Sequence, residues 1–266
     1  MDIGIVGASG RMGQVLIKLV TEHPELTLAG ATDHESSTFI GKDVCEVMGG
    51  KPTGVIIASD PLDAFRDVKA IIDFSSPAAT LINAEFAAQA RIVHVIGTTG
   101  LSEADLLAIK AASRHATIIR SGNMSLGVNL LAALTRQTAK ALGIEYDIEI
   151  VESHHHHKVD APSGTAILLG EAAADGRGVN LADVTDSGRD GITGARKQGD
   201  IGFSAIRGGD IVGEHDVMFL GDGERITLRH VATDRKLFAN GALKAALWGE
   251  NQGPGLFSMQ DVLGLS

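Results

Sequence analysis

The sequence predicts an α/β protein with two parts, a doubly wound parallel sheet followed by a mixed α+β domain. Two observations predict the sheet. Short, fully apolar segments alternate with helical ones, and a glycine-rich turn joins the first apolar segment to the first helix. A third observation predicts the mixed domain, because apolar and polar residues alternate with the period of a strand through much of 199–234. A chain of 266 residues is long enough for one large domain or two modest ones.

The expected elements follow one another in a regular order. Strands are expected within residues 3–6, 26–33, 54–60, 70–77, 91–100 and 116–122. Helices are expected at 11–24, 77–89, 102–115, 126–143 and 163–174, and again in the tail at 238–265. Ser102 and Ser163 are natural N-caps. We expect the tail to return to the first part, which gives a dinucleotide-binding domain at 1–125 and 235–266 and a second domain at 126–234.

Composition excludes several classes of partner. The formal net charge is −10, so a polyanionic nucleic acid would be repelled by the average field. No apolar run approaches the roughly 20 residues that cross a bilayer, and the first residues lack the pattern of a secretory signal. A single cysteine, Cys45, excludes an internal disulfide framework. We therefore expect a cytoplasmic protein without membrane or nucleic-acid partners.

The segment "GASGRMG" places Gly7, Gly10 and Gly13 where the first strand passes into the first helix. The spacing departs from GxGxxG, but glycines here still allow a tight turn, close approach to a pyrophosphate and close packing of the helix. Asp33 ends the second strand about 20 residues past the last glycine, where an acidic side chain meets ribose hydroxyls. Singly these residues are typical of turns and caps. Together they predict a Rossmann-type domain that binds a dinucleotide.

The choice between NADH and NADPH depends on the surroundings of Asp33. Its carboxylate accepts hydrogen bonds from a free 2′-hydroxyl and repels a 2′-phosphate, but Arg11 and His34 could offset that repulsion. Both cofactors therefore stay open. The turns at 97–100 and 121–125 follow later strands, so we expect them at the carboxyl edge of the sheet, near the nicotinamide.

Four consecutive histidines stand in "VESHHHHKVDAPSGTA", residues 151–166. Consecutive residues of a strand point to alternate faces, so only members such as His154 and His156 could converge on a metal, and no HExxH or CxxC pattern supplies further ligands. We therefore expect no metal site. The segment is also not expected to be an affinity tag, because such tags are terminal and usually longer, whereas this run is internal and follows an apolar strand. A solvated polar loop without function stays open at this point.

The residues after the histidines favour an anion site. Ser163 precedes a run of good helix formers, so Gly164 and Thr165 would expose free N–H groups at the positive end of a helix. Lys158 and the imidazoles add positive charge and could donate a proton to a carbanion or enamine left by hydride addition. These residues alone predict a reductase of a small, anionic, unsaturated substrate.

The chain resembles the bacterial 4-hydroxy-tetrahydrodipicolinate reductases, also called dihydrodipicolinate reductases, of lysine and diaminopimelate biosynthesis. The resemblance covers essentially the whole chain, and the histidine segment is its most specific part. The segments that carry it, in order, are "GASGRMG", "IDFSSP", "VIGTTG", "SGNMSLGVN", "ESHHHHKVDAPSGTA", "GFSAIRGGDIVGEH" and "FANGALKAALW".

The resemblance implies an oxidoreductase that uses NADH or NADPH to reduce a cyclic dicarboxylic hydroxy-imine, with loss of water, and that assembles as a homotetramer. His154 and Lys158 match the family's proton-transferring residues. His155, Gly164 and Thr165 match substrate-binding positions. The positions that match cofactor contacts are Gly7, Ala8, Ser9, Gly10, Arg11, Met12, Asp33, His34, Gly97, Thr98, Thr99, Ser121, Gly122, Asn123 and Met124.

Three positions depart from the family pattern. His34 stands where some members carry Arg against a 2′-phosphate, which puts a strong NADPH preference in doubt. His156 stands where others carry Arg, and we assign no role to it or to His157. Met124 replaces a common Phe and is expected to keep an apolar contact.

Three other functions are weighed against this one. A dinucleotide sensor without activity would not need His154 and Lys158 beside an anion-binding helix terminus. A metal-dependent hydrolase would lose activity with chelators. Another reductase with the same two domains, such as an aspartate or homoserine dehydrogenase, would not be expected to carry "HHHHKVDAPSGT".

Overall fold

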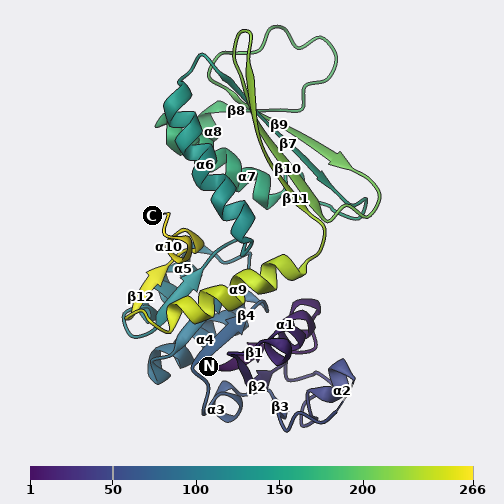
Figure 1. The fold of residues 1–266 in the computed structure, drawn as a ribbon, viewed down its shortest axis with the longest axis vertical. Helices are drawn as coiled ribbons and strands as arrows, with labels where there is room; N and C mark the ends of the chain where they lie inside the picture. The colour runs from purple at the N-terminus through teal and green to yellow at the C-terminus, as the bar shows by residue number, and fades with distance from the viewer. Residues whose placement is uncertain (50, 266) are drawn as a thin grey trace. The chain divides into compact units, whose positions relative to one another are not determined.

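The helices and strands form two compact units in this computed structural model, which describes residues 1–49 and 51–265. Unit 1 comprises residues 1–124 and 236–264, and unit 2 comprises 125–235 together with Leu265. From the sequence we expected the divisions after residues 125 and 234. Figure 1 shows the chain coloured from its N-terminus to its C-terminus.

Unit 1 contains a seven-stranded sheet in the order β12-β6-β5-β4-β1-β2-β3, in which every pair of neighbours is parallel. Its strands are β1 (Asp2–Val6), β2 (Thr27–Thr32), β3 (Ile57–Ala58), β4 (Ala70–Asp73), β5 (Val93–Ile96), β6 (Thr117–Arg120) and β12 (Gly255–Phe257). The order of β1 to β6 is that of a doubly wound Rossmann sheet. The predicted parallel sheet is confirmed.

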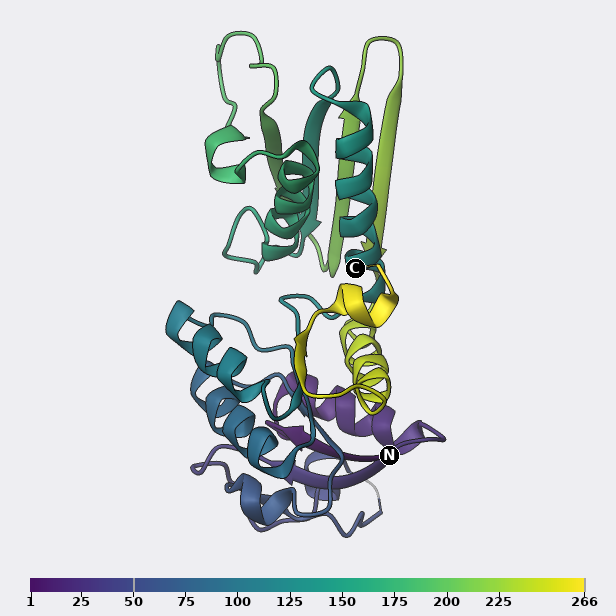
Figure 2. The same cartoon turned by 90° about the vertical axis from the view of Figure 1, so that its left-hand side faces the viewer.

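Helices cover both faces of this sheet. In Figure 2, α1 (Arg11–Glu22) and α9 (Lys236–Gly249) lie on one face, and α4 (Pro77–Ala90) and α5 (Glu103–Ala112) lie on the other. Strand residues are therefore buried whichever way they point, which is why β4 and β5 are buried at every position and read as apolar runs. The remaining helices of the unit are short: α2 (Cys45–Met48), α3 (Pro61–Ala64) and α10 (Met259–Leu263).

We expected a helical tail, but the tail is helical only in part. After α9 the chain forms the strand β12, which pairs in parallel with β6, and only then the short helix α10. Gly253, Pro254 and Gly255 explain the break, because proline cannot continue a helix and glycine weakens one. A strand of three residues is too short to show a period in the sequence.

Unit 2 contains a five-stranded mixed sheet in the order β11-β10-β7-β9-β8. β7 pairs in parallel with β9, β9 in parallel with β8, and β10 is antiparallel to both β7 and β11. The strands are β7 (Asp147–His154), β8 (Thr185–Ser187), β9 (Ile201–Arg207), β10 (Gly213–Leu220) and β11 (Arg225–Ala232). The mixed sheet predicted for the second part is confirmed.

One face of this sheet packs on helices. α6 (Leu126–Leu142), α7 (Gly164–Arg177) and α8 (Leu181–Val184) lie on that face, as Figure 1 shows. Burial along β7 alternates residue by residue, so Ile148, Ile150, Glu152 and His154 point toward the helices. The first two join the apolar core of the unit, and the last two stand beyond it at the end of the strand.

Gly241 marks a close approach inside unit 1. A Cβ atom added to Gly241 in α9 would overlap the backbone carbonyl oxygen of Met124. Backbone cannot move aside as a flexible side chain can, so Gly241→Ala should lower the free energy of unfolding by roughly 1–3 kcal/mol. This loss exceeds the gain of about 1 kcal/mol that alanine brings to a helix. Urea unfolding followed by circular dichroism measures the change.

Gly253→Ala is the matched control, because a Cβ atom there would meet nothing within 4 Å. Its effect should be below about 1 kcal/mol and stabilising, since alanine restricts the unfolded chain. Equal stability in the two variants would contradict the tight contact at Gly241.

Candidate active site

The loop between β1 and α1 forms the first part of the site in unit 1. The N–H groups of Gly7 and Ala8 donate to the carbonyl oxygen of Thr32, both at 2.9 Å, and Gly7 has a φ of 73°, which favours glycine. The chain can therefore turn sharply into α1. Gly10 is the N-cap of α1 and has no side chain to cap the helix, which suits the binding of an anion by the first N–H groups.

Gly13 brings α1 close to this loop. A Cβ atom on Gly13 would overlap the carbonyl oxygen of Gly7. The third glycine of the motif thus serves the close packing of helix on loop that a dinucleotide-binding turn needs. This cradle of glycines at a helix N-terminus fits a pyrophosphate.

Asp33 lies beside the same loop. Its carboxylate accepts the N–H of Ser9 at 3.1 Å, the N–H of His34 at 2.9 Å and the hydroxyl of Ser37 at 3.2 Å, and the residue is buried. The structure therefore brings Asp33 and the glycine-rich loop together. The Arg11 and His34 side chains are exposed at this edge of unit 1.

The Thr98 hydroxyl is hydrogen-bonded inside unit 1. It lies 3.2 Å from Asp73 Oδ1 and 2.9 Å from the Thr80 hydroxyl. It also accepts the N–H of Ser75 at 3.2 Å. Asp73 is itself buried, 3.4 Å from His94 Nε2. Burial raises the pKa of Asp73, but its interactions with His94 and Ser75 lower the pKa by more, so that it falls below its ordinary value. The Thr98 side chain is thus committed to holding the loops after β4 and β5 together.

The other expected cofactor positions follow β5 and β6. Gly97 donates its N–H to the carbonyl oxygen of Asp73 at 2.8 Å, and the Ser121 hydroxyl donates to that of Asn123 at 2.7 Å. Thr99 and Gly122 are exposed, whereas Met124 is 1% exposed. The Met124 side chain is therefore packed inside unit 1, and its apolar contact with a cofactor stays a prediction. Because the strands are parallel, all these loops lie at the carboxyl edge of the sheet.

In unit 2, Glu152 is the hub of a buried hydrogen-bond network at the end of β7. Its Oε2 lies 2.6 Å from His154 Nδ1 and accepts Arg207 Nη1–H at 2.8 Å. Its Oε1 accepts Arg207 Nη2–H at 2.7 Å and the N–H of Ser163 at 3.0 Å. Burial raises the pKa of Glu152, but these hydrogen bonds outweigh it and hold the pKa below its ordinary value. The carboxylate is therefore ionised at neutral pH.

His154 is oriented by this carboxylate. An ionised carboxylate only accepts, so Nδ1 of His154 carries a hydrogen and Nε2 is the nitrogen that can exchange a proton with a substrate. The His154 ring also meets the edge of the His215 ring, with centroids 5.1 Å apart. Burial, followed by the nearby charge of His154, lowers the pKa of His215 to about 4, so His215 is neutral at pH 7.

Lys158 lies in the loop that follows β7. Its Nζ donates to both carboxylate oxygens of Asp160, at 2.8 and 2.9 Å, and its side chain is 19% exposed. An ammonium group has three donors, so this pair leaves capacity for a second anionic partner. Lys158 and His154 come from one segment of chain and belong to the same end of unit 2.

The N-terminus of α7 has the expected cap. The Ser163 hydroxyl accepts the N–H of Ala166 at 3.1 Å, and the same oxygen lies 3.1 Å from His215 Nε2. Ser163 is buried, whereas Gly164 is exposed and Thr165 half-buried. The positive end of the α7 dipole therefore lies at the exposed Gly164, as a carboxylate site requires.

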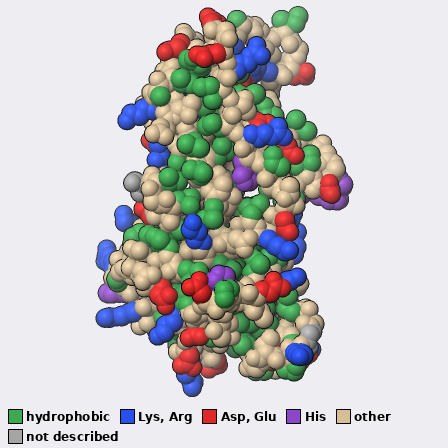
Figure 3. All heavy atoms as spheres, in the orientation of Figure 1, with side chains coloured by type: hydrophobic (Ala, Val, Ile, Leu, Met, Phe, Trp, Pro, Cys, Tyr) green, Lys and Arg blue, Asp and Glu red, His purple; other side chains and the backbone are tan. Residues whose placement is uncertain are grey.

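The remaining histidines play other parts. His156 Nδ1 lies 2.8 Å from the carbonyl oxygen of Gly209 and so links the loops after β7 and β9. Burial, followed by the nearby Arg235, lowers the pKa of His155. Figure 3 shows histidine side chains together near the end of β7. Within residues 1–49 and 51–265, no group of three or more His, Cys, Asp or Glu side chains could hold a metal ion.

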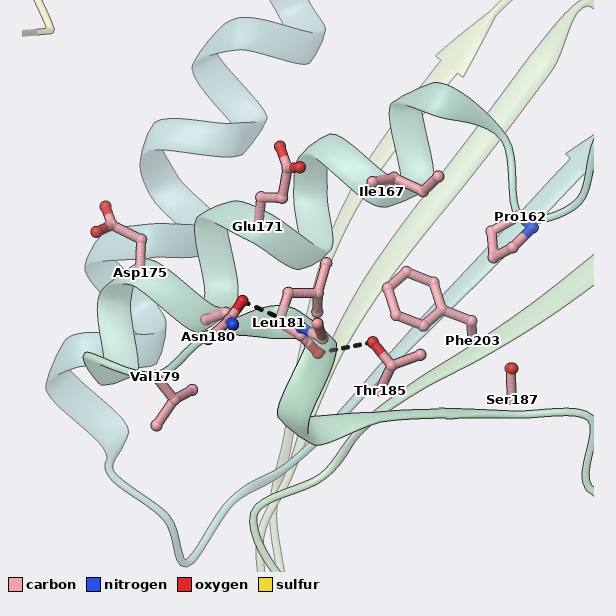
Figure 4. A pocket seen from close by; sticks show the side chains of 12 residues that line it. Pro162, Ile167, Glu171, Asp175, Val179, Asn180, Leu181, Thr185, Ser187 and Phe203 are labelled. Atoms are coloured by element: carbon pink, nitrogen blue, oxygen red, sulfur yellow. Dashed lines mark hydrogen bonds between the residues drawn. The ribbon is translucent and has the colours of Figure 1, made fainter. Parts of the chain in front are cut away.

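A separate cavity of about 570 Å³ lies between α7, α8, β8 and β9 (Figure 4). The Asn180 side chain accepts the N–H of Ala182 at its wall, and the Thr185 hydroxyl donates to the carbonyl oxygen of Leu181. The residues that line it include none of the five expected to bind substrate or move protons. The cavity is therefore distinct from the site at the end of β7.

Sequence reasoning missed Glu152, Arg207 and His215. A signal existed for Glu152, because it stands two residues before His154 on a strand and must share its face. The other two become neighbours only through strand pairing, in which Arg207 is the register partner of His154 and His215 that of Glu152.

Comparison with known proteins gives a consistent result. The family model described as "Dihydrodipicolinate reductase, N-terminus" matches residues 1–124, and the one described as "Dihydrodipicolinate reductase, C-terminus" matches 127–263. A 4-hydroxy-tetrahydrodipicolinate reductase of Dinoroseobacter shibae is 64% identical over 263 residues, 99% of this chain and 98% of the relative. A protein of the same name from Parvibaculum lavamentivorans is 62% identical over 266 residues, 100% of this chain and 98% of the relative.

A solved structure shows the same fold. It is a dipicolinate-bound dihydrodipicolinate reductase from Paenisporosarcina sp. TG-14, with a TM-score of 0.72 and 22% identity over 98% of both chains. Because the two family models span almost the whole chain and these relatives are more than 60% identical along their length, the chain belongs to the dihydrodipicolinate reductase family.

Proposed function

We propose that unit 1 binds NADH or NADPH and that unit 2 binds the substrate and supplies the proton. The chain is an oxidoreductase of lysine and diaminopimelate biosynthesis, in which its family reduces 4-hydroxy-tetrahydrodipicolinate. A bound nicotinamide supplies the hydride. The observation that carries the division of roles is the pairing, within unit 2, of an oriented imidazole with the N-terminus of helix α7.

Unit 1 holds the dinucleotide through backbone and carboxylate groups. The N–H groups at the start of α1 bind the pyrophosphate, and Gly7 to Met12 line it. Asp33 accepts from the adenosine ribose. The loops at Gly97–Thr99 and Ser121–Asn123 support the nicotinamide end, with Thr98 acting through its backbone because its hydroxyl is engaged elsewhere.

Unit 2 holds the substrate and moves the proton. Gly164 and Thr165 at the start of α7 bind one substrate carboxylate, and His155 also binds the substrate. His154 presents Nε2–H to the reacting atoms, while Glu152 holds the ring through Nδ1. Lys158 is the second proton donor, and its ammonium charge offsets the negative charge of the dicarboxylate.

Replacing either proton-transferring residue tests this assignment. His154→Ala and Lys158→Ala should each lower kcat by at least about 100-fold, the usual scale of acid–base contributions, while NADH binding changes little. Turnover is followed as loss of absorbance at 340 nm, with the substrate produced in situ by the preceding synthase.

His156→Ala is the control from the same histidine run, because the residue is exposed and its ring bonds the Gly209 backbone and lies beside the His157 ring. It should keep turnover close to that of the unaltered enzyme. Near-normal turnover in both His154→Ala and Lys158→Ala would contradict the proposed donors. Absence of turnover with either cofactor in the unaltered protein would favour a sensor.

The cofactor preference follows from the charge beside the ribose. Asp33 disfavours a 2′-phosphate and the exposed Arg11 and His34 favour it, so we expect both cofactors to be used, with less than about a tenfold preference for NADPH. Asp33→Asn keeps the acceptor for Ser9 N–H but removes the charge. It should raise the ratio of kcat/KM for NADPH to that for NADH, and Arg11→Gln should lower it. A ratio that neither variant moves would show that these residues do not contact the 2′-position.

A homotetramer is also proposed, on the basis of the second face of the unit 2 sheet. The residues on that face include Val151, Ile206, Met218 and Val231, and no described helix of the unit covers them. Light scattering should give a mass of about four times 27.7 kDa. Val151→Arg should lower that mass, whereas Leu107→Arg, an exposed change in α5 of unit 1, should not. A monomeric mass for the unaltered protein would reject the tetramer.

We further propose a cytoplasmic location, on the ground that one cysteine permits no internal disulfide of the kind that stabilises proteins of oxidising compartments. The net charge of −10 supports a protein without nucleic-acid partners. Among the described residues, no helix is long and apolar enough to cross a membrane.

A further inference from the structure

Four N–H donors converge on one buried carboxylate in unit 2. Glu152 is 1% exposed, and its two oxygens take two hydrogen bonds from Arg207, one from His154 and one from the backbone of Ser163. Each oxygen receives one guanidinium hydrogen and one other. The arrangement uses the whole acceptor capacity of a carboxylate, and an amide or a hydroxyl in its place could not reproduce it.

Strand geometry explains why these groups meet. Glu152 and His154 are two residues apart on β7 and therefore share the face that looks toward α7. Arg207 is the register partner of His154 on the parallel strand β9. Ser163 begins α7 on the same side. The carboxylate thus stands between the imidazole and the start of the helix.

We propose that Glu152, clamped by Arg207, is a positioning residue that fixes the proton-donating His154 and the carboxylate-binding start of α7 relative to each other. This inference rests on the proposed function of those two groups. One oxygen of Glu152 sets the orientation and tautomer of the His154 ring. The other holds the N–H of Ser163, so the helix whose next residues bind substrate begins at a fixed distance from the proton donor.

His215 supports the same arrangement from a third strand. Its ring contacts that of His154, and its Nε2 bonds the hydroxyl of Ser163. The neutral state of His215 at pH 7 leaves Arg207 as the cation that compensates the buried charge of Glu152. Hydrogen bonding to Glu152 raises the pKa of Arg207, so this compensation persists at any working pH.

A purely structural ion pair is the competing explanation, and the same strand provides a comparison. Glu149 is likewise paired with two arginines, Arg189 at 2.5 Å and Arg196 at 2.8 Å, but it points to the other face of the sheet. Glu149→Gln removes one charge from an arginine-paired carboxylate without touching His154 or Ser163. It is the matched control for Glu152→Gln.

The effect of pH depends on every charged group that faces His154. These are Glu152 on its own strand, Arg207 on β9, His215 on β10, and His155, Lys158 and Asp160 in the following segment, while α7 contributes its N-terminus. Glu152 is the only one of these groups, within the described residues, shown to bond the His154 ring. Replacing it with a neutral amide removes the negative charge that contacts this ring, so the pH profile of kcat should differ from that of the unaltered enzyme.

The test compares unaltered enzyme, Glu152→Gln, Glu149→Gln and His154→Ala as full-length proteins. Glu152→Gln should lower kcat by roughly 10–100-fold at pH 7, as loss of an orienting partner does. It should also change the pH profile of kcat and weaken binding of pyridine-2,6-dicarboxylate, measured by calorimetry. NADH binding should be unchanged. Glu149→Gln should resemble the unaltered enzyme in all four measurements.

Glu152→Asp provides a second variant if Glu152→Gln does not fold. It keeps the negative charge for Arg207 but withdraws the carboxylate by one methylene from His154 and Ser163. Its kcat should fall by more than about 10-fold with NADH binding intact. Turnover close to normal in this variant would overturn the inference.

The outcomes separate the inference from the function on which it rests. If His154→Ala loses turnover but Glu152→Gln keeps both the pH profile of kcat and the affinity for the dicarboxylate, the positioning role is wrong and the proposed function stands. If His154→Ala turns over normally, the proposed proton donor is wrong and the positioning role falls with it.

Discussion

A buried negative charge at the end of β7 is the constraint on which the rest of unit 2 depends. Removing a carboxylate from water is costly unless a counter-charge and a full set of hydrogen bonds replace the solvent, and Glu152 has both. Satisfying it requires β9 in one register, α7 starting at one residue, and an imidazole in one tautomer. A one-residue slip of β9 would turn Arg207 to the opposite face and leave the charge uncompensated. Chemistry and topology are therefore specified by the same group.

In unit 1 the loops at the carboxyl edge of the sheet are placed with few charged side chains. Its cofactor loops are placed by parallel strands that end at one edge, and glycines set how near the backbone can come. The buried Asp73 bonds His94 and Thr98, and these contacts connect the ends of β4 and β5. This difference between the two units follows from the chemistry of the two ligands. A dinucleotide is recognised largely through its phosphates and ribose by backbone N–H groups, whereas a small dicarboxylate that must be protonated needs directed side chains.

Much of this could be read from the sequence, and the part that could not has a common cause. Local signals sufficed for the alternation of strands and helices, for Gly7, Gly10 and Gly13, and for the cap at Ser163. Contacts between segments that are distant in the sequence could not be predicted, because they depend on how the strands pair. Arg207 lies 53 positions beyond His154, and only the pairing of β7 with β9 makes them neighbours. The Thr98 hydroxyl looked available for a ligand until its buried partners were known. The strand β12 was hidden because three residues carry no period.

The insertion of one unit within the other bears on how the protein is made. The first 124 residues leave the ribosome without α9 and β12, yet α9 packs on β4, β5, β6 and α1 and so covers one face of the nucleotide-binding sheet. Until residues 236–264 are synthesised, that face presents apolar strand residues to water. The core residues of unit 2, in contrast, all lie within residues 125–235, so this core can form while translation proceeds. The dinucleotide-binding unit is thus the first to begin folding and the last to finish.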